Sequence, residues 1–388
     1  MHLNNQRWLS MSFFVFFFTW GIFLPYWTGW LTSAKGLSVT QASVLMGVGM
    51  IARSFSTFFL FPYATRNMSL LRVIRWTTFL SFILTLAYLP ESPFAVLFGL
   101  TVLFSSIYPI ILPSVESGAS LLMQNERIHY GKSRSFGSIG YTVALLLIGT
   151  VTAIWSEQAI LYMMIIGLGM GLIFFFQPAP VALQLHPVVD SAAQKGQLRA
   201  LFANKSFVTV LCIAILLQGS HASYYNYGFI FLDDMGINGF YIGLILNIAV
   251  LFEIIFFTQA DRLLAGVKTS TIFLIAATGS TIRWISIFLF PMTSVFIATQ
   301  VLHSVSFGMA HFAFIQYIST NIPNHLIASA QGVYAAVALS LSIAILTFPA
   351  GYLYDQSPRF AFLSMAVCAI GALILISGTK QHISRIIE

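Results

Sequence analysis

Charged residues are scarce in this chain of 388 residues, because Asp, Glu, Lys and Arg together make up 7% of it. A soluble domain has roughly 25%. Hydrophobic residues make up 58% of the chain, and phenylalanine alone occurs 37 times. A core of ordinary size cannot bury so much apolar surface, so the composition excludes a soluble globular protein. The lipid bilayer is the expected solvent.

Cysteine is scarce as well, since the chain has Cys212 and Cys368 and no other. Both lie within predicted membrane spans, where we expect buried free thiols, and their spacing fits neither a disulfide framework nor a metal site. The sequence also lacks HExxH, GxSxG and paired catalytic aspartates. An ATP-binding motif is absent too. We therefore expect no enzyme activity, no cofactor and no metal, and any driving energy must come from an ion or substrate gradient.

Long apolar stretches fill most of the chain. A membrane-spanning helix needs about 20 apolar residues, and the first stretch is too long and too aromatic for a signal peptide. The sequence therefore predicts twelve spans, at residues 9–31, 40–62, 70–89, 94–122, 133–155, 158–176, 205–232, 239–259, 269–290, 292–321, 327–353 and 360–377.

The net charge of +7 follows from membrane topology and does not indicate a nucleic-acid partner. If the N-terminus is cytoplasmic, the outer connections hold two basic residues, Lys35 and Arg359. The inner segments then hold fourteen: Arg7, Arg66, Arg72, Arg75, Arg127, Lys132, Arg134, Lys195, Arg199, Lys205, Arg262, Lys268, Lys380 and Arg385. This positive-inside asymmetry predicts a bacterial inner-membrane protein with both termini in the cytoplasm.

The longest polar stretch, residues 177–206, divides the predicted spans six and six. Its prolines and charges indicate a cytoplasmic linker. We therefore expect an all-α membrane protein with an N-terminal six-helix bundle at 1–176, a linker at 177–204 and a C-terminal six-helix bundle at 205–388. In transporters built from two similar halves, the substrate site lies near the midplane between them.

Two other classes of membrane protein compete with a transporter. A channel usually places its filter in one short segment that oligomerisation repeats, whereas the polar residues here are scattered over many spans. An intramembrane enzyme has no motif to support it. We expect a monomer surrounded by membrane lipids that binds a small-molecule substrate.

Ionisable and polar residues inside the spans are the candidate functional residues, because such residues usually face a cavity or a partner. In "LLQGSHASYYNYGFIFL" (216–232), Gln218, His221, Tyr225 and Gly228 follow helical spacing, with Tyr224 beside them. We expect this face to line a wet or ligand-filled space. The opposite positions Leu217, Phe229 and Ile230 are expected to face lipid.

The remaining candidates are charged. At 1.5 Å per residue, Arg283 lies roughly 11 Å, His303 roughly 16 Å and Glu253 roughly 21 Å from the outer membrane surface. A planar guanidinium such as Arg283 suits a carboxylate. Glu253, flanked by "VLF" and "IIFF", suits proton carriage because apolar surroundings favour the protonated carboxyl. Glu116 is the second choice of carrier, because Arg134 across a short loop is expected to pair with it.

Several segments together resemble a known family over essentially the full length of the chain. They are "GIFLPYWTGWL" (21–31), "HYGKSRSFGSIGY" (129–141), "LLQGSHASYY" (216–225), "FEIIFF" (252–257), "VLHSVSFGMAHFAFIQYI" (301–318) and "QGVYAAVALSLSIAILTFPAGYLYD" (331–355). The chain resembles the major facilitator superfamily, in the branch that contains lactose permease and the bacterial 3-phenylpropionate permeases. The resemblance implies the major facilitator fold and transport by alternating access.

The resemblance also implies roles for individual residues. Glu116 and Arg134 match the sugar-binding carboxylate and arginine of lactose permease, and Tyr141 falls where a tryptophan stacks on the sugar. Arg283 and His303 match an arginine and a histidine of the binding and coupling machinery. Ser306, however, stands where that permease has its proton-carrying glutamate.

Further positions depart from lactose permease. His221 and Tyr224 stand where it has two aspartates, and Glu253 lies about two turns beyond the position of its sugar-ligating glutamate. A cavity with fewer acids, more aromatic rings and an available arginine fits an aromatic carboxylate better than a galactoside.

We therefore expect proton-coupled uptake of a phenylpropionate-like acid. The alternative is a proton symporter of a neutral sugar, oligosaccharide or nucleoside, and a drug-efflux antiporter is a third possibility. The expected substrate-binding residues are Gln218, His221, Tyr224, Tyr225, Arg283, His303, Tyr141, Glu116 and Arg134, and the expected proton-coupling residues are Glu253 and Glu116.

Overall fold

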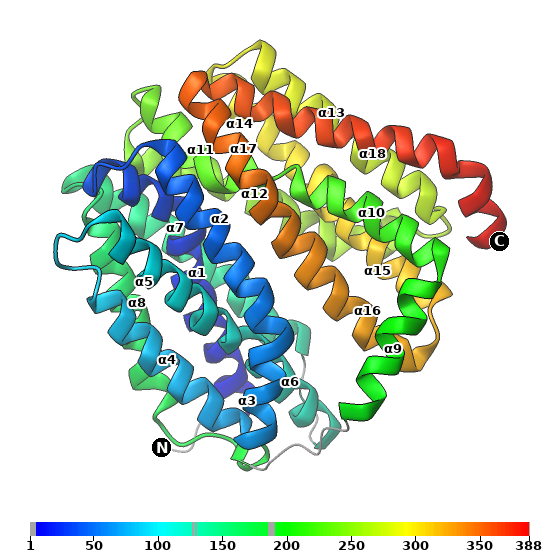
Figure 1. Ribbon diagram of the computed structural model, residues 1–388, viewed down its shortest axis with the longest axis horizontal. Coiled ribbons are helices and arrows are strands. Elements are labelled where there is room, and N and C mark those ends of the chain that lie inside the picture. The colour runs from blue at the N-terminus through cyan, green and yellow to red at the C-terminus, as the bar shows by residue number, and fades with distance from the viewer. Residues whose placement is uncertain (1–4, 126–127, 129, 185–190, 388) are drawn as a thin grey trace. The chain divides into compact units, whose positions relative to one another are not determined.

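The structure, a computed structural model, describes residues 5–125, 128, 130–184 and 191–387. In this part of the chain the secondary structure is helical, without strands (Figure 1), which confirms the expected all-α class. The chain forms two compact units, the first made of Met1–Val189 and Gly236–Leu244 and the second of Asp190–Met235 and Ile245–Glu388. The division into bundles at 1–176 and 205–388 stays a prediction.

The helices up to the central connection include short π-helical and 3-10 segments, which are labelled η. They are α1 (Asn5–Gly29), η1 (Trp30–Ala34), α2 (Val39–Phe55), η2 (Ser56–Leu60), α3 (Phe61–Asn67), α4 (Leu70–Leu86), α5 (Phe94–Ile107), η3 (Tyr108–Ile110), α6 (Ile111–Asn125), α7 (Tyr130–Ile154), α8 (Ala159–Phe175) and η4 (Val181–Gln184).

The later helices contain two longer π-helical segments, η5 and η6. In order they are α9 (Ser191–Ala203), α10 (Lys205–Gly219), α11 (Ala222–Asp234), α12 (Gly239–Leu263), α13 (Thr269–Leu289), α14 (Thr293–His303), η5 (Ser304–Met309), α15 (Ala310–Asn321), α16 (Asn324–Val333), η6 (Tyr334–Leu341), α17 (Ser342–Gln356) and α18 (Pro358–Ile387).

Ten helical segments among the described residues are long and apolar enough to cross a membrane. They are Asn5–Ala34, Val39–Thr65, Phe94–Ala119, Lys132–Ile154, Lys205–Asp234, Gly239–Ala260, Thr269–Leu289, Thr293–Asn321, Ser329–Gln356 and Pro358–Gly378. The spans predicted at 70–89 and 158–176 correspond to α4 and α8, which have 17 residues each. The total of twelve spans stays a prediction.

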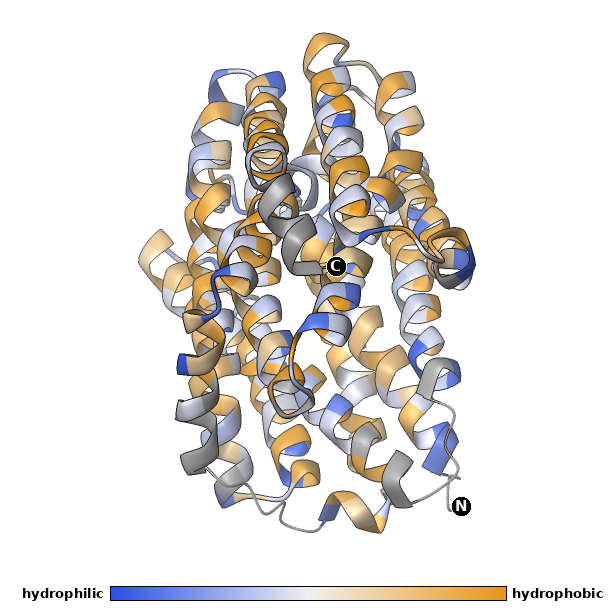
Figure 2. Ribbon diagram, turned by 90° about the vertical axis from the view of Figure 1, so that its right-hand side faces the viewer, coloured by the Kyte–Doolittle hydropathy of each residue, from blue (hydrophilic) through white to orange (hydrophobic). Residues whose placement is uncertain are grey.

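Large apolar side chains are exposed along many of these helices. Phe59 is 63% exposed, Trp155 76% and Ile173 71%. Figure 2 shows that hydrophobic residues colour most of the helical ribbon, while much of the hydrophilic colour lies at helix ends and connections. Such surfaces are unfavourable in water and suit contact with lipid.

The expectation of buried thiols was wrong, because Cys212 is exposed and Cys368 half-buried.

The first unit is built around α1, which packs against α7 and α8. The approach of α1 to α7 depends on small residues, as is common between membrane helices. A Cβ added at Gly21 would lie 3.1 Å from the carbonyl oxygen of Tyr141, and one added at Gly140 would clash with the carbonyl oxygen of Phe14. Backbone atoms cannot rotate away as a side chain can, so Gly140 needs to be glycine, whereas at Gly21 the neighbours would have to shift by a few tenths of an ångström.

The substitution Gly140→Ala is therefore expected to lower the stability of the protein by about 1–3 kcal/mol, the usual effect of overpacking. Gly99→Ala is the matched control, because a Cβ at Gly99 meets nothing within 4 Å. The measurement is the unfolding temperature of the two purified variants in the same detergent. Equal unfolding temperatures would show that the contact between α1 and α7 tolerates a methyl group.

The span 205–232 is not one continuous helix. The chain turns at Ser220 and His221, between α10 and α11, so the predicted helical face of Gln218, His221, Tyr225 and Gly228 is interrupted there. The rings of His221 and Tyr225 nevertheless stack with their centres 5.9 Å apart. The lipid-facing side was wrong: Leu217, Phe229 and Ile230 are buried. The reason is that α11 is covered by other helices, among them α17 and α18.

Candidate functional site

Arg283 on α13 is fully buried and lies at the centre of a polar cluster in the second unit. Its Nη1 atom donates to Nδ1 of His303 at 2.9 Å and to Oγ of Ser306 at 3.2 Å. The guanidinium carbon lies 4.6 Å from the ring centre of Tyr224 and 4.4 Å from that of Trp284. Cation–π attraction of this kind stabilises an arginine that has left water.

Two donor atoms of Arg283 are unsatisfied. Nε and Nη2 are buried and have no hydrogen-bond partner among the described residues, although buried polar groups nearly always have one. An unsatisfied buried donor costs about 1–3 kcal/mol, and more when it is charged. Nε and Nη2 form one edge of the planar guanidinium, and such an edge can bind both oxygens of a carboxylate. The Tyr224 side chain is a neutral neighbour that interacts with this guanidinium. The edge therefore lacks an anionic partner among the described residues and can bind a carboxylate in a desolvated place.

The hydrogen bonds also define how the two histidines of the cluster are protonated. Because Arg283 donates, Nδ1 of His303 accepts, and a neutral ring then carries its hydrogen on Nε2. His221 has Nδ1 3.0 Å from the carbonyl oxygen of Leu217 and Nε2 3.1 Å from Oγ of Ser306. Its Nδ1 therefore donates and its Nε2 accepts. Ser306 consequently relays a hydrogen bond from Arg283 to His221.

Glu253 on α12 extends this network. Its Oε2 atom lies 3.4 Å from Nε2 of His303, and its side chain is 29% exposed. In a neutral ring with its hydrogen on Nε2, this nitrogen of His303 is the one that lies nearer to the carboxylate of Glu253. A chain of contacts thus connects the partly accessible Glu253 to the buried Arg283 through one imidazole ring.

Aromatic rings surround the polar cluster. The ring of Tyr224 lies 5.4 Å from that of His303, and Tyr225 lies 5.9 Å from His221 and 6.3 Å from His303. His221 occupies the N-cap position of α11, at the break between α10 and α11. Interrupted membrane helices of this kind occur at the substrate sites of many transporters.

Gln218 belongs to a neighbouring group of residues and not to the cluster itself. Its Nε2 atom donates to the hydroxyl of Tyr334 at 3.0 Å, and Nδ1 of His311 lies 3.0 Å from the same hydroxyl. The rings of His303, Phe307 and His311 stack in succession, with centroid distances of 5.3 and 6.1 Å. Phe307 lies in the π-helical segment η5, a helix type that is frequent at functional sites.

The first unit holds the other three predicted site residues. Nε of Arg134 on α7 lies 3.5 Å from Oε1 of Glu116 on α6, so the expected pair is present. The guanidinium of Arg134 also lies 4.1 Å from the ring centre of Phe17. Tyr141, also on α7, packs against Gly21 of α1.

Sequence reasoning brought together Arg283, His303 and the tyrosines, but it missed several contacts. Ser306 was noted for its lack of a titratable proton, not as the hydrogen-bond partner that joins Arg283 to His221. Trp284 and Tyr334 were missed. The aromatic residue directly after Arg283 is the signal that could have indicated a ring beside the guanidinium. Among the described residues, no group of three His, Cys, Asp or Glu side chains could hold a metal ion.

Comparison with curated proteins gives relatives that match along most of their length. The chain is 28% identical over 378 residues to a protein of Escherichia coli (strain K12) named "Probable 3-phenylpropionic acid transporter". The match covers 97% of this chain and 98% of the relative. It is also 27% identical over 288 residues to the maltose permease of Geobacillus stearothermophilus, covering 73% of this chain and 71% of the permease.

Solved structures share the fold. The crystal structure of the nucleoside transporter NupG matches with a TM-score of 0.82 at 15% identity, covering 98% of this chain and 99% of that one. The family named the MFS_1 like family matches residues 6–364. Because this match spans nearly the whole chain and the helices are those of a multi-pass membrane protein, the chain belongs to the MFS_1 like family of the major facilitator superfamily.

Proposed function

We propose that this protein is a secondary active transporter that takes up a small aromatic carboxylate together with protons. The observation that carries the proposal is the edge of Arg283 that lacks an anionic partner among the described residues. The guanidinium is fully buried, and no hydrogen-bond acceptor satisfies its Nε and Nη2 in this part of the chain, so an anionic ligand is favoured there. The adjacent rings of Tyr224 and Trp284 offer apolar contacts to an aromatic ligand. The name of the Escherichia coli relative, which refers to 3-phenylpropionic acid, supports this class of substrate.

The proposed architecture is that of two pseudo-symmetric six-helix bundles with twelve spans. The bundles comprise residues 1–176 and 205–388, joined by a cytoplasmic linker at 177–204, and transport proceeds by alternating access. The protein works as a monomer in the inner membrane with both termini in the cytoplasm, as the distribution of basic residues indicates.

The residues proposed to contact substrate are those expected from the sequence. In the second unit, Arg283 binds the carboxylate and the aromatic rings enclose the hydrocarbon part. Glu253 carries the proton, because its contact with His303 connects a partly accessible carboxyl group to the substrate arginine. The proposed substrate-binding residues are Arg283, His303, Tyr224, Tyr225, His221, Gln218, Tyr141, Glu116 and Arg134, with Glu116 as the second candidate for proton coupling.

A neutral sugar is the second candidate substrate, supported by the relative named maltose permease. A sugar would use the Glu116–Arg134 pair and leave the edge of Arg283 without an anion. Because this edge is already desolvated, the carboxylate is the better ligand.

A thermal-shift screen of the purified protein tests this choice. A ligand that binds the native state raises the unfolding temperature, so 3-phenylpropionate is expected to raise it in a concentration-dependent way. Maltose, uridine and the neutral amide of the same acid are the controls. Stabilisation by maltose or uridine and not by the acid would contradict the proposed substrate class.

A further inference from the structure

A second arginine, Arg53, lies inside a membrane span of the first unit and takes no part in the function proposed so far. It is the 15th residue of the segment Val39–Thr65, about 21 Å from its start at 1.5 Å per residue. Its side chain is half-buried. Among the described residues, no hydrogen bond or ion pair engages this guanidinium. Charged residues at membrane depth are rare and usually functional.

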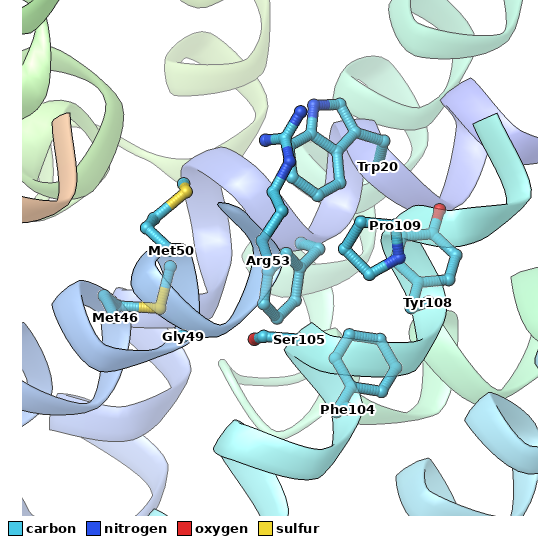
Figure 3. A pocket seen from close by; sticks show the side chains of 10 residues that line it. Trp20, Met46, Gly49, Met50, Arg53, Phe104, Ser105, Tyr108 and Pro109 are labelled. Atoms are coloured by element: carbon cyan, nitrogen blue, oxygen red, sulfur yellow. The ribbon is translucent and has the colours of Figure 1, made fainter. Parts of the chain in front are cut away.

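The guanidinium of Arg53 lies over an aromatic ring and beside a narrow pocket. Its carbon atom is 4.6 Å from the ring centre of Trp20, and Figure 3 shows the two side chains next to each other at the pocket. Apart from Ser105, the remaining lining residues are mostly apolar, and they come from α1, α2 and the segment around η3. They include Phe23, Met46, Met50, Phe104 and Tyr108.

The polar group of Tyr108 is already engaged elsewhere. Its hydroxyl donates to the carbonyl oxygen of Phe16 at 2.9 Å, and its ring stacks on that of Phe104 at 5.2 Å. Tyr108 therefore forms a wall of the pocket, and it is also an uncharged electrostatic neighbour of Arg53. Among the described residues that line the pocket, the guanidinium of Arg53 is the charged group, and none of the others supplies a negative charge.

The backbone around this pocket is irregular on both sides. The α-helix α2 changes to the π-helical η2 at Ser56, and α5 changes to the 3-10 segment η3 at Tyr108. The hydroxyl of Ser56 donates to the carbonyl oxygen of Ser106, which joins the two irregular segments. Gly49 and Ser105 make a close approach, since a Cβ at Gly49 would lie 2.7 Å from the Ser105 oxygen. Such departures from α-helix geometry are frequent at functional sites.

We propose that Arg53 and the ring of Trp20 form a separate site for the carboxylate group of a small organic anion. The guanidinium binds the two oxygens of the anion. The ligand class rests on the proposed function, but the site shares no residue with the Arg283 cluster. The anionic headgroup of a lipid has similar chemistry, and the experiment distinguishes it from a free carboxylate.

The test is isothermal titration of 3-phenylpropionate into the full-length protein in nanodiscs of phosphatidylcholine. In the Arg283→Gln variant, a weaker binding event is expected to remain. Adding Arg53→Gln to this variant should weaken that event about tenfold or more, as expected for a lost charged hydrogen bond. Arg53→Lys should retain part of it, and the neutral amide should not bind there. The unfolding temperature of each variant verifies that it is folded.

Three outcomes would overturn the proposal of this site. The first is that Arg283→Gln shows no residual binding event, and the second is that this event is unchanged in the double variant. The third is that Arg53 affects binding only in nanodiscs with phosphatidylglycerol, which would assign the site to lipid. Failure of the proposed function is recognised separately, because Arg283→Gln would then bind 3-phenylpropionate like the unaltered protein.

Discussion

Replacing Arg283 with glutamine is expected to weaken the tighter binding event of 3-phenylpropionate by about 30-fold or more. Removing one partner of a buried charged pair costs about 2–5 kcal/mol, and each 1.4 kcal/mol is about tenfold in affinity. Glutamine keeps a hydrogen-bond donor but loses the charge and the planar edge of Nε and Nη2 that has no partner among the described residues. The effect should be confined to carboxylates.

The matched control for this prediction is Arg359→Gln. Arg359 also lies over a ring, with its guanidinium carbon 5.5 Å from the centre of Phe360, but it is exposed. Its replacement should leave the affinity unchanged. Titration calorimetry of both variants, together with their unfolding temperatures, makes the comparison. If Arg283→Gln binds the acid normally and loses only the binding of a sugar, the preferred substrate class is wrong.

Replacing Glu253 with glutamine is expected to separate exchange from uphill transport. Glutamine has nearly the same shape and can still accept from Nε2 of His303, which lies 3.4 Å from Oε2 of Glu253. It cannot carry a proton. Exchange of substrate across the membrane should therefore continue, whereas accumulation driven by a pH gradient should fall to the level reached without a gradient.

Both activities are measured in proteoliposomes that contain the same amount of each variant. Glu91→Gln is the control, because Glu91 is exposed in the connection between α4 and α5. If gradient-driven uptake is unchanged in Glu253→Gln, Glu253 is excluded as the proton carrier, and Glu116 becomes the candidate to test next. Loss of exchange together with uptake would indicate a structural or substrate-binding role for Glu253.

The depth of the charged residues could be predicted from the sequence because the rise of a helix is constant. Arg283, His303 and Glu253 were placed by counting along their spans, and the structure brings all three into one network. The pairing of Glu116 with Arg134 was predictable for a similar reason, since a short loop between antiparallel helices leaves their inner ends adjacent.

The surroundings of α11 could not be predicted in the same way. In a bilayer, residues that face lipid and residues that face other helices are both apolar. The sequence around Phe229 and Ile230 therefore does not show whether these side chains contact lipid or other helices. The break at Ser220 and His221 has a weak signal in Gly219 and Ser220, because both residues have lower helix propensity than alanine. The contacts of Ser306 depend on the π-helical turn of η5, which cannot be predicted from the residue spacing of a regular α-helix.

The central claim is that this protein couples the entry of an aromatic carboxylate to a proton gradient. The most direct test is the uptake of radiolabelled 3-phenylpropionate into proteoliposomes with an acidic exterior and a neutral interior. We expect the internal concentration to rise above the external one and to fall back when a protonophore is added. The claim is contradicted if the label never exceeds the external concentration at any pH difference, while maltose or uridine accumulates under the same gradient.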